Sequence, residues 1–420
     1  MIANVIHTFG SRIGIAIISF LILSLNAHFL GPEGLGTIGL IILGITIVQL
    51  ITNLINGSII YFSSRTNKAN LVLIAYLWSL FSVAIFALIN QFFELFDAEY
   101  EIHIYILAFL QSVVSIHLYI LLGVENIKTH NFYSLAQSVL IILGVCIYYF
   151  LLDRTDVMAF VEALYTAYFC TALGSGAAIF PYSKVADPKI IKADFIKAIK
   201  YGFYIQTANT FQLLNYRLSY FILDAYAGRA ALGQYTASIQ LSEALLIPGR
   251  SIATVQYARI SAKQNDAYAQ RITFLFMKVS FLITLLGTVL LLILPESIYQ
   301  LILGDAFDQV KLLIFCMALG LVALSAEIIL SHYFSGTGRQ HINSISAGIG
   351  LATTLVGCFL LIPDYGAVGA AVTTAASYGA MFFFLFIMMN FQKGVSSVQF
   401  IPNRQDFQLL KKLIAKRNSA

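Results

Sequence analysis

Charged and amide side chains recur inside segments of the chain that are otherwise strongly apolar. Arg217 and Arg250 lie well within such segments, and Arg12 lies in another if its helix begins before Ile13. Polar groups are expensive in hydrocarbon, so those that occur there generally face a cavity or a partner. Arginines in a cavity could bind an anionic group through charge-assisted hydrogen bonds, and amides beside them could bind polar groups of the same ligand.

These polar residues fall on one face of each helix that carries them. They recur at intervals of three, four or seven residues, and such intervals align side chains along a helix. We therefore predict that they line a water-filled cavity. For any single amide the alternative is a hydrogen bond between packed helices, and for a lysine it is snorkelling to the membrane surface. The predicted substrate-binding residues are Arg12, Asn26, Gln49, Asn53, Asn209, Gln212, Tyr216, Arg217, Gln240, Arg250 and Lys278.

Two carboxyl groups and one proline lie where they could serve transport. Glu243 and Glu327 lie deep in apolar segments, and a buried carboxylate could carry a proton or a sodium ion. Glu243 could instead form an ion pair with an arginine. Pro248 and Gly249 should disturb their helix because proline lacks an amide donor. We predict a hinge there, which is either a gate or static.

The sequence predicts no catalytic residue, no metal site and no cofactor. The four cysteines lie in apolar segments without ligand-like spacing and are expected to be small packing residues. His117 is expected to be a hydrogen-bonded core residue. The gaps between the apolar segments are too short to hold a soluble catalytic domain.

The elements that carry these residues are long apolar helices. The chain of 420 residues is 59% hydrophobic and 11% charged, with a mean hydropathy of +0.83, which is far more apolar than a soluble core requires. A helix crosses hydrocarbon with about 20 residues. Runs of that length predict twelve spans, the first too long for a cleaved signal peptide. The spans are 13–30, 35–62, 71–93, 102–123, 132–152, 157–180, 199–223, 230–257, 272–294, 310–334, 342–362 and 367–390.

Lysine and arginine are concentrated in every second gap between the spans. The other gaps hold only Arg154 and Arg229 and are otherwise acidic. Because positively charged loops stay on the cytoplasmic side, this alternation predicts an even number of spans with both termini in the cytoplasm. The net charge of +5 is therefore a signal of topology and does not suggest nucleic-acid binding.

The two halves of the chain look like copies of each other. A short turn around Leu35-Gly36 follows the first span, and one around Leu232-Gly233 follows the seventh. The offset between these turns also pairs Asn53 with Arg250, so a polar position falls on a polar position. Halves with six spans each enter the membrane in the same sense. They are therefore parallel repeats, and a cavity is expected at their interface.

The prediction is an all-α polytopic membrane protein with twelve transmembrane helices in two six-helix lobes around a central cavity. The N-lobe covers residues 1–183, a basic cytoplasmic linker covers 184–198, the C-lobe covers 199–394 and a cytoplasmic tail covers 395–420. Apolar residues of the tail, interleaved with lysines, fall on one face of a potential helix. This pattern predicts an amphipathic helix on the anionic inner leaflet, and a disordered basic tail is the alternative.

Three stretches of the chain carry a resemblance to a known family. They are residues 29–36 (FLGPEGLG) after the first span, 336–340 (GTGRQ) before the eleventh and 361–371 (LIPDYGAVGAA) before the twelfth. With these stretches in these positions, the chain resembles the polysaccharide-transporter branch of the multidrug/oligosaccharidyl-lipid/polysaccharide exporter superfamily. Within that branch it is most similar to the O-antigen and related repeat-unit flippases.

The resemblance implies a two-lobed fold around a cationic cavity that works by alternating access. It implies a flippase of the bacterial inner membrane, not an enzyme, that moves undecaprenyl-pyrophosphate-linked oligosaccharides from the inner to the outer leaflet. The product would be O-antigen, as in lipopolysaccharide, or a related surface polysaccharide. A proton or sodium gradient would drive the transport as in an antiporter. Beyond membrane lipid, a polysaccharide polymerase and a chain-length regulator are candidate partners.

Three other functions compete with this one. A multidrug or cation antiporter of the same superfamily typically uses acidic groups in its first lobe, whereas the first span here offers Arg12 and no carboxylate. A membrane glycan polymerase or ligase would need a large outer loop, and the gaps here are short. A non-transporting scaffold would not require arginines on stripes that face a cavity.

Overall fold

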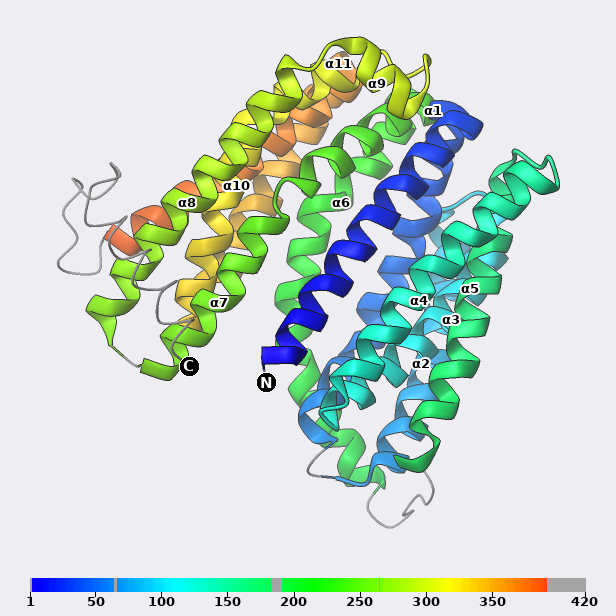
Figure 1. Ribbon diagram of the computed structural model, residues 1–420, viewed down its shortest axis with the longest axis vertical. Coiled ribbons are helices and arrows are strands. Elements are labelled where there is room, and N and C mark those ends of the chain that lie inside the picture. Colours follow the sequence, from blue (N-terminus) through cyan, green and yellow to red (C-terminus); the bar gives the residue numbers. More distant parts are fainter. Residues whose placement is uncertain (1, 64–65, 183–190, 264, 391–420) are drawn as a thin grey trace. The chain divides into compact units, whose positions relative to one another are not determined.

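The computed structural model describes residues 2–63, 66–182, 191–263 and 265–390, which form helices joined by short turns (Figure 1). No strand occurs in these ranges, and the all-α prediction is confirmed. The predicted tail over 395–420 and the start of the predicted linker over 184–198 lie outside the described residues. The helices are α1 (Ile2–Phe62), α2 (Lys68–Phe93), α3 (Ala98–Gly123), α4 (Ile127–Cys146), η1 (Ile147–Leu151), α5 (Val157–Ile179), η2 (Phe180–Tyr182), α6 (Ile191–Ala244), α7 (Ile247–Lys263), α8 (Asp266–Ile293), α9 (Glu296–Leu303), α10 (Val310–Gly336) and α11 (Gln340–Asn390).

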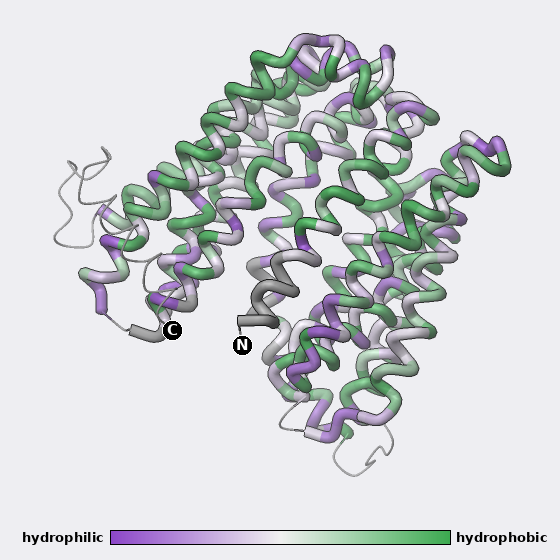
Figure 2. Tube along the Cα trace, viewed as in Figure 1, coloured by the Kyte–Doolittle hydropathy of each residue, from purple (hydrophilic) through white to green (hydrophobic). Residues whose placement is uncertain are grey.

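Eight helices in the described part of the chain are long and apolar enough to cross a membrane. Among them, the 53 residues of α1 from Gly10 and the 51 residues of α11 are each long enough for two crossings. α6 has 54 residues but is not one of the eight, because amides and charges interrupt it. Large apolar side chains such as Phe92 (83% exposed) and Leu319 (85% exposed) are exposed, as on surfaces that contact lipid. Hydrophobic residues predominate along most of the helices (Figure 2).

Three long helices each contain a glycine whose backbone is not helical. Gly31 has φ 65° and ψ −173°, Gly228 has φ 80° and ψ 176°, and Gly366 has φ 54° and ψ −128°. A positive φ strains residues that have a Cβ, so glycine is the suitable residue where one span turns into the next. Each glycine lies in a turn predicted between two spans. The described helices therefore contain the twelve predicted spans, the eighth of which continues from α6 into α7.

The chain divides into two compact units. Unit 1 comprises the chain up to Ala237 together with Glu296–Val310, and unit 2 comprises Ser238–Pro295 together with the chain from Lys311 onwards. α6 therefore contributes its first part to unit 1 and its end to unit 2. The short helix α9 belongs to unit 1, where it packs against α1.

Each unit has its own apolar core. α7, α8, α10 and both ends of α11 contribute the core of unit 2. Unit 1 is packed around α1, α3 and α5, with Val48 and Leu107 fully buried. Its one buried histidine among the described residues, His117, is 2% exposed and lies 2.5 Å from the Tyr76 hydroxyl and 2.7 Å from the Ser175 hydroxyl. The prediction that His117 is a hydrogen-bonded core residue is confirmed.

Candidate functional site

Within unit 1, α6 crosses α1 at two points where the backbones touch. Gly202 packs against the carbonyl oxygen of Leu54, and Gly233 packs against the carbonyl oxygen of Pro32. A Cβ at either glycine would clash with that oxygen, so the approach requires glycine. Gly202 was not predicted, because an isolated glycine inside a helix follows no pattern. The part of α6 between the two crossings, which carries the predicted polar stripe, is held along α1.

The crossing near Gly233 is reciprocal. Gly36 packs against the carbonyl oxygen of Arg229, four residues before Gly233, in the same manner. The two crossing glycines, and likewise the turn glycines Gly31 and Gly228, are separated by the offset that the sequence indicates between the two halves. The repeat therefore reappears in the backbone conformation and in the contacts. The first turns of the two halves pair about a local pseudo-twofold axis.

The predicted cationic residues differ in their surroundings. Arg217 on α6 is half-buried, its Nη1 donates a 2.6 Å hydrogen bond to the Tyr220 hydroxyl, and its guanidinium carbon lies 5.1 Å from the centre of that ring. Arg12 on α1 is exposed, and Arg250 on α7 is exposed. The structure thus places Arg12 and Arg217 in unit 1 and Arg250 in unit 2.

Two of the predicted amides on α1 form hydrogen bonds inside unit 1. Asn26 is 2% exposed and accepts a 2.8 Å hydrogen bond from the Tyr149 hydroxyl. Gln49 donates to the Ala108 carbonyl oxygen at 3.0 Å and to the Ser112 hydroxyl at 2.9 Å. Both side chains join packed helices, which is the alternative considered for single amides.

Two other amides on α1 have unpaired polar atoms. Oδ1 of Asn53 and both side-chain polar atoms of Asn56 are buried without a hydrogen-bond partner within the described ranges. An unpaired buried polar atom costs about 1–3 kcal/mol. Such atoms in native proteins are usually paired with ordered water or with a ligand. This part of α1 is therefore a candidate for contact with a polar ligand.

The polar stripe of α6 lies on the surface of unit 1. Asn209 and Gln212 are exposed, Tyr216 is half-buried, and Gln212 donates a 3.2 Å hydrogen bond to the Tyr216 hydroxyl. Further along α6, in unit 2, Gln240 is also exposed. Exposed amides on a helix in a membrane protein indicate contact with water or with a polar ligand, since lipid offers no hydrogen-bond partner.

Two charged residues are buried in unit 2. Lys278 on α8 is 9% exposed and Glu327 on α10 is 5% exposed. The hydroxyl of Ser280 donates a 3.1 Å hydrogen bond to the carbonyl oxygen of Ser325. Ser280 lies two residues after Lys278 on α8, and Ser325 lies two residues before Glu327 on α10. Because the two serines are in contact, Lys278 and Glu327 lie at a similar depth in their helices. The other predicted ion-coupling candidate, Glu243, is half-buried on α6.

The helix is interrupted directly before the predicted hinge. α6 ends at Ala244 and α7 begins at Ile247, so Pro248 is the second residue of α7. Proline is well tolerated in the first turn of a helix because its missing amide proton breaks no helical hydrogen bond there. The next residue, Gly249, packs against the Ser280 hydroxyl of α8.

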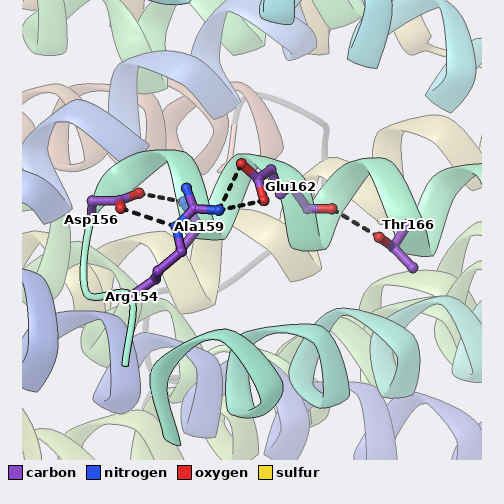
Figure 3. Close-up of polar contacts among 5 residues, drawn as sticks. All are labelled: Arg154, Asp156, Ala159, Glu162 and Thr166. Carbon is purple, nitrogen blue, oxygen red and sulfur yellow. Dashed lines mark hydrogen bonds and ion pairs between the residues drawn. The ribbon is translucent and has the colours of Figure 1, made fainter. Parts of the chain in front are cut away.

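The two arginines of the acidic gaps are both paired with carboxylates. Nη1 of Arg154 lies 3.0 and 2.8 Å from the two carboxylate oxygens of Glu162 (Figure 3). The hydrogen bonds to Glu162 raise the pKa of Arg154 above its ordinary value. Arg229 pairs with Asp97 at 2.9 Å and with Asp224 at 2.6 Å. Both arginines therefore serve local structure.

A duplicated helical hairpin and long apolar helices, with a polar stripe on one of them, are the features of a polytopic membrane protein. The chain matches the family described as "Polysaccharide biosynthesis protein" over residues 1–264, and it belongs to that family. This membership agrees with the resemblance to a polysaccharide family that the sequence indicates, and that resemblance is confirmed.

Two relatives match part of the chain. It is 25% identical over 170 residues to "Capsular polysaccharide biosynthesis protein CapF" of Staphylococcus aureus, covering 39% of this chain and 42% of the relative. It is 24% identical over 218 residues to "Uncharacterized membrane protein MJ1068" of Methanocaldococcus jannaschii, covering 50% of this chain and 43% of the relative. The matched part of this chain spans less than half the length of either curated relative.

Solved structures share the fold at low sequence identity. The chain superposes on the lipid II flippase MurJ in an inward closed conformation with a TM-score of 0.73 at 15% identity, covering 95% of this chain and 89% of the flippase. An inward-facing multidrug resistance transporter of the MATE family gives 0.70 at 14% identity, covering 91% and 97%. One of these proteins is named as a flippase and the other as a transporter.

Proposed function

We propose that this protein is a flippase that moves lipid-linked oligosaccharides from the inner to the outer leaflet of a bacterial inner membrane. The observation that carries the proposal is the polar stripe of α6, where Asn209 and Gln212 are exposed beside the half-buried Arg217. α6 is clamped to α1 at both ends of this stripe. A helix with such a face is unfavourable against lipid, so the stripe would face a wet cavity between the two predicted lobes.

The chemistry of the substrate fits such a stripe. A lipid-linked oligosaccharide has an anionic pyrophosphate, and moving an isolated ion through hydrocarbon costs tens of kcal/mol on Born estimates. Arg12, Arg217 and Arg250 would replace its lost hydration by charge-assisted hydrogen bonds. Amide and tyrosine side chains would bind the sugar hydroxyls. The undecaprenyl chain is apolar and would stay outside the cavity, on the lipid-facing side of the protein.

The comparisons support a surface polysaccharide as the product. The S. aureus relative is named for capsular polysaccharide biosynthesis, and the structural neighbour MurJ is named as a lipid II flippase. We therefore include capsular repeat units beside the O-antigen units of lipopolysaccharide as substrates. In this proposal both termini are cytoplasmic, the lobes alternate in access, and Glu243 or Glu327 couples the cycle to protons or sodium ions.

The test is polysaccharide export in cells that depend on this protein. Arg217→Ala and Arg250→Ala should each reduce the export of repeat units severely while the amount of protein in the membrane stays normal. Arg217→Lys should restore part of it, because lysine keeps the charge and loses the planar hydrogen-bonding group. Arg271→Ala, which removes an exposed arginine at the start of α8, is the matched control and should export normally. Normal export by both Arg217→Ala and Arg250→Ala would disprove the proposal.

A further inference from the structure

Unit 1 has an apolar groove of about 390 Å³ between the start of α6 and the neighbouring part of α2. Its volume lies within the roughly 300–1,000 Å³ that is usual for small-molecule sites. The lining includes Leu77, Trp78 and Phe81 from α2, and Phe195 and Lys192 from α6. Lys192 is the one charged residue of the lining.

The walls of the groove are aromatic and face outwards. The ring of Trp78 lies 5.5 Å from that of Phe81 and 6.2 Å from that of Phe195. Trp78 donates its indole N–H to the carbonyl oxygen of Ile51 at 2.9 Å, so its polar atom is satisfied inside unit 1. Leu77 is 59% exposed and Phe81 is 53% exposed. The groove therefore opens to the surroundings of the protein, and its exposed apolar walls suit contact with lipid.

Lys192 supplies a cation at the end of the groove where both helices begin. It is exposed, and within the described ranges no carboxylate forms an ion pair with it. The nearest acidic residue along the helix, Asp194, is 4% exposed and accepts a 3.2 Å hydrogen bond from Asn70. Two residues along a helix correspond to about 200° of rotation, so Asp194 points away from the groove. Among the described carboxylates none neutralises Lys192, so its charge is available to an anion at this end of the groove.

We propose that this groove holds the polyprenyl chain of the lipid-linked substrate, with Lys192 contacting the phosphate next to that chain. This inference rests on the proposed function. A polyprenyl phosphate is one apolar chain with an anionic end, which matches an apolar groove that ends at one cation. A phospholipid instead joins two chains to one head group. The bulky aromatic walls offer a firm surface for a methyl-branched chain. The groove would hold the substrate at the predicted cytoplasmic end of unit 1.

The experiment is photo-crosslinking of the full chain in phosphatidylcholine nanodiscs that contain a small fraction of undecaprenyl phosphate. A photoreactive phenylalanine replaces Leu77 in the groove or, as the matched control, Leu88, which is equally exposed on α2 (58%) but does not line the groove. The adduct, measured by mass spectrometry, should form several-fold more at position 77. Equal yields at both positions would show contact with bulk lipid alone and would overturn the proposal.

Two pairs of variants test the chemistry of the site. Lys192→Glu should lower the adduct at position 77 about tenfold, the effect of losing about 1.4 kcal/mol. Lys197→Glu, an exposed lysine of α6 outside the groove, should leave it unchanged. Phe81→Ala should weaken it, whereas Phe92→Ala on the same helix should not. An adduct insensitive to Lys192→Glu would overturn the assignment.

A competitor and an export assay separate the remaining outcomes. Excess phosphatidylglycerol should not displace undecaprenyl phosphate, and displacement in proportion to its concentration would show a phospholipid site instead. Export of repeat units by wild-type protein is measured in parallel in cells. Export without the position-77 adduct would refute the groove and leave the flippase intact. The adduct without export would refute the flippase function while showing a polyprenyl phosphate site.

Discussion

Gly233 of α6 rests directly against the carbonyl oxygen of Pro32 in α1, with no space between them for a side chain. Gly36 of α1 repeats this contact with the carbonyl oxygen of Arg229. The two contacts join the first turns of the two halves of the sequence. Because each contact involves backbone on both sides, a substitution cannot be absorbed by a change of side-chain rotamer.

We expect Gly233→Ala to destabilise the protein by about 1–3 kcal/mol, the usual effect of overpacking. Gly348→Ala is the matched control, because a Cβ at Gly348 in α11 would have no neighbour within 4 Å. The measurement is thermal unfolding in detergent. Gly348→Ala should unfold at the wild-type temperature or above, since alanine favours helix. Equal unfolding temperatures for the two variants would contradict the close approach.

The turn glycines should respond to substitution through backbone strain alone. A Cβ at Gly31 or Gly228 would contact nothing within 4 Å, yet both residues have a positive φ. We expect Gly31→Ala to cost about 1–3 kcal/mol. Gly31→Asn should cost less, because asparagine tolerates this conformation better. Gly57→Ala, an open helical position in the same α1, should be neutral or stabilising when the same unfolding temperature is measured.

These turns show why much of the fold could be predicted. Glycine at a positive φ and about 20 apolar residues per span are local requirements, so the pattern of residues reveals both. The offset set by Leu35-Gly36 and Leu232-Gly233 therefore also relates Gly31 to Gly228. The proline of the predicted hinge was also visible, although the structure places Pro248 in the first turn of a new helix and not inside a kinked one.

Other features depend on packing between distant segments and could not be predicted. Stripe periodicity does not distinguish Asn26, which bonds to Tyr149, from Asn53, whose Oδ1 has no partner in the described part of the chain. In the sequence, Lys192 is one of several lysines in a basic gap, and nothing local distinguishes it from the others. Its place beside Trp78 follows from α6 packing against α2, which no local pattern encodes.

The hydrogen bonds of His117 define its tautomer and lead to a prediction about stability. The Ser175 hydroxyl donates to the carbonyl oxygen of Thr171 at 2.6 Å, so its oxygen accepts a hydrogen bond from Nδ1–H of His117. Nε2 of His117 then accepts from the Tyr76 hydroxyl. Tyr76→Phe should cost about 1 kcal/mol and Ser175→Ala about 1–3 kcal/mol by leaving buried ring atoms unpaired.

A double-mutant comparison tests this network by thermal unfolding. Once His117→Leu has removed the ring nitrogens, Tyr76→Phe should have a much smaller effect than in the wild type, because residues of one network are coupled. Leu88→Ala, at an exposed position remote from the ring, serves as the additive control. Strict additivity between the substitutions at positions 76 and 117 would exclude the network.

The ion pairs of Arg229 should contribute modestly and depend on salt. Arg229 is 23% exposed in its side chain, against 48% for Asp97 and 22% for Asp224. We expect a coupling energy of about 0.2–1 kcal/mol between Arg229 and Asp97, as for partly exposed pairs. It should shrink at high ionic strength because salt screens exposed charges. The measurement is a double-mutant cycle of unfolding free energies for Arg229→Ala, Asp97→Asn and the double variant. A coupling energy that stays the same at high salt would contradict the prediction of a screened ion pair.

Glu327 offers the sharpest test of ion coupling. It is 5% exposed within unit 2, where an ionised carboxylate is unfavourable unless a cation accompanies it. Glu327→Gln keeps the shape and removes the exchangeable charge. In proteoliposomes the variant should therefore translocate a lipid-linked oligosaccharide at a rate that no longer responds to an imposed proton or sodium gradient. Glu243→Gln is measured in parallel because that residue is the other candidate. If Glu327→Gln responds to the gradient like wild type and Glu243→Gln does not, the coupling group lies on α6, and if both respond, neither carboxylate couples transport to the ion.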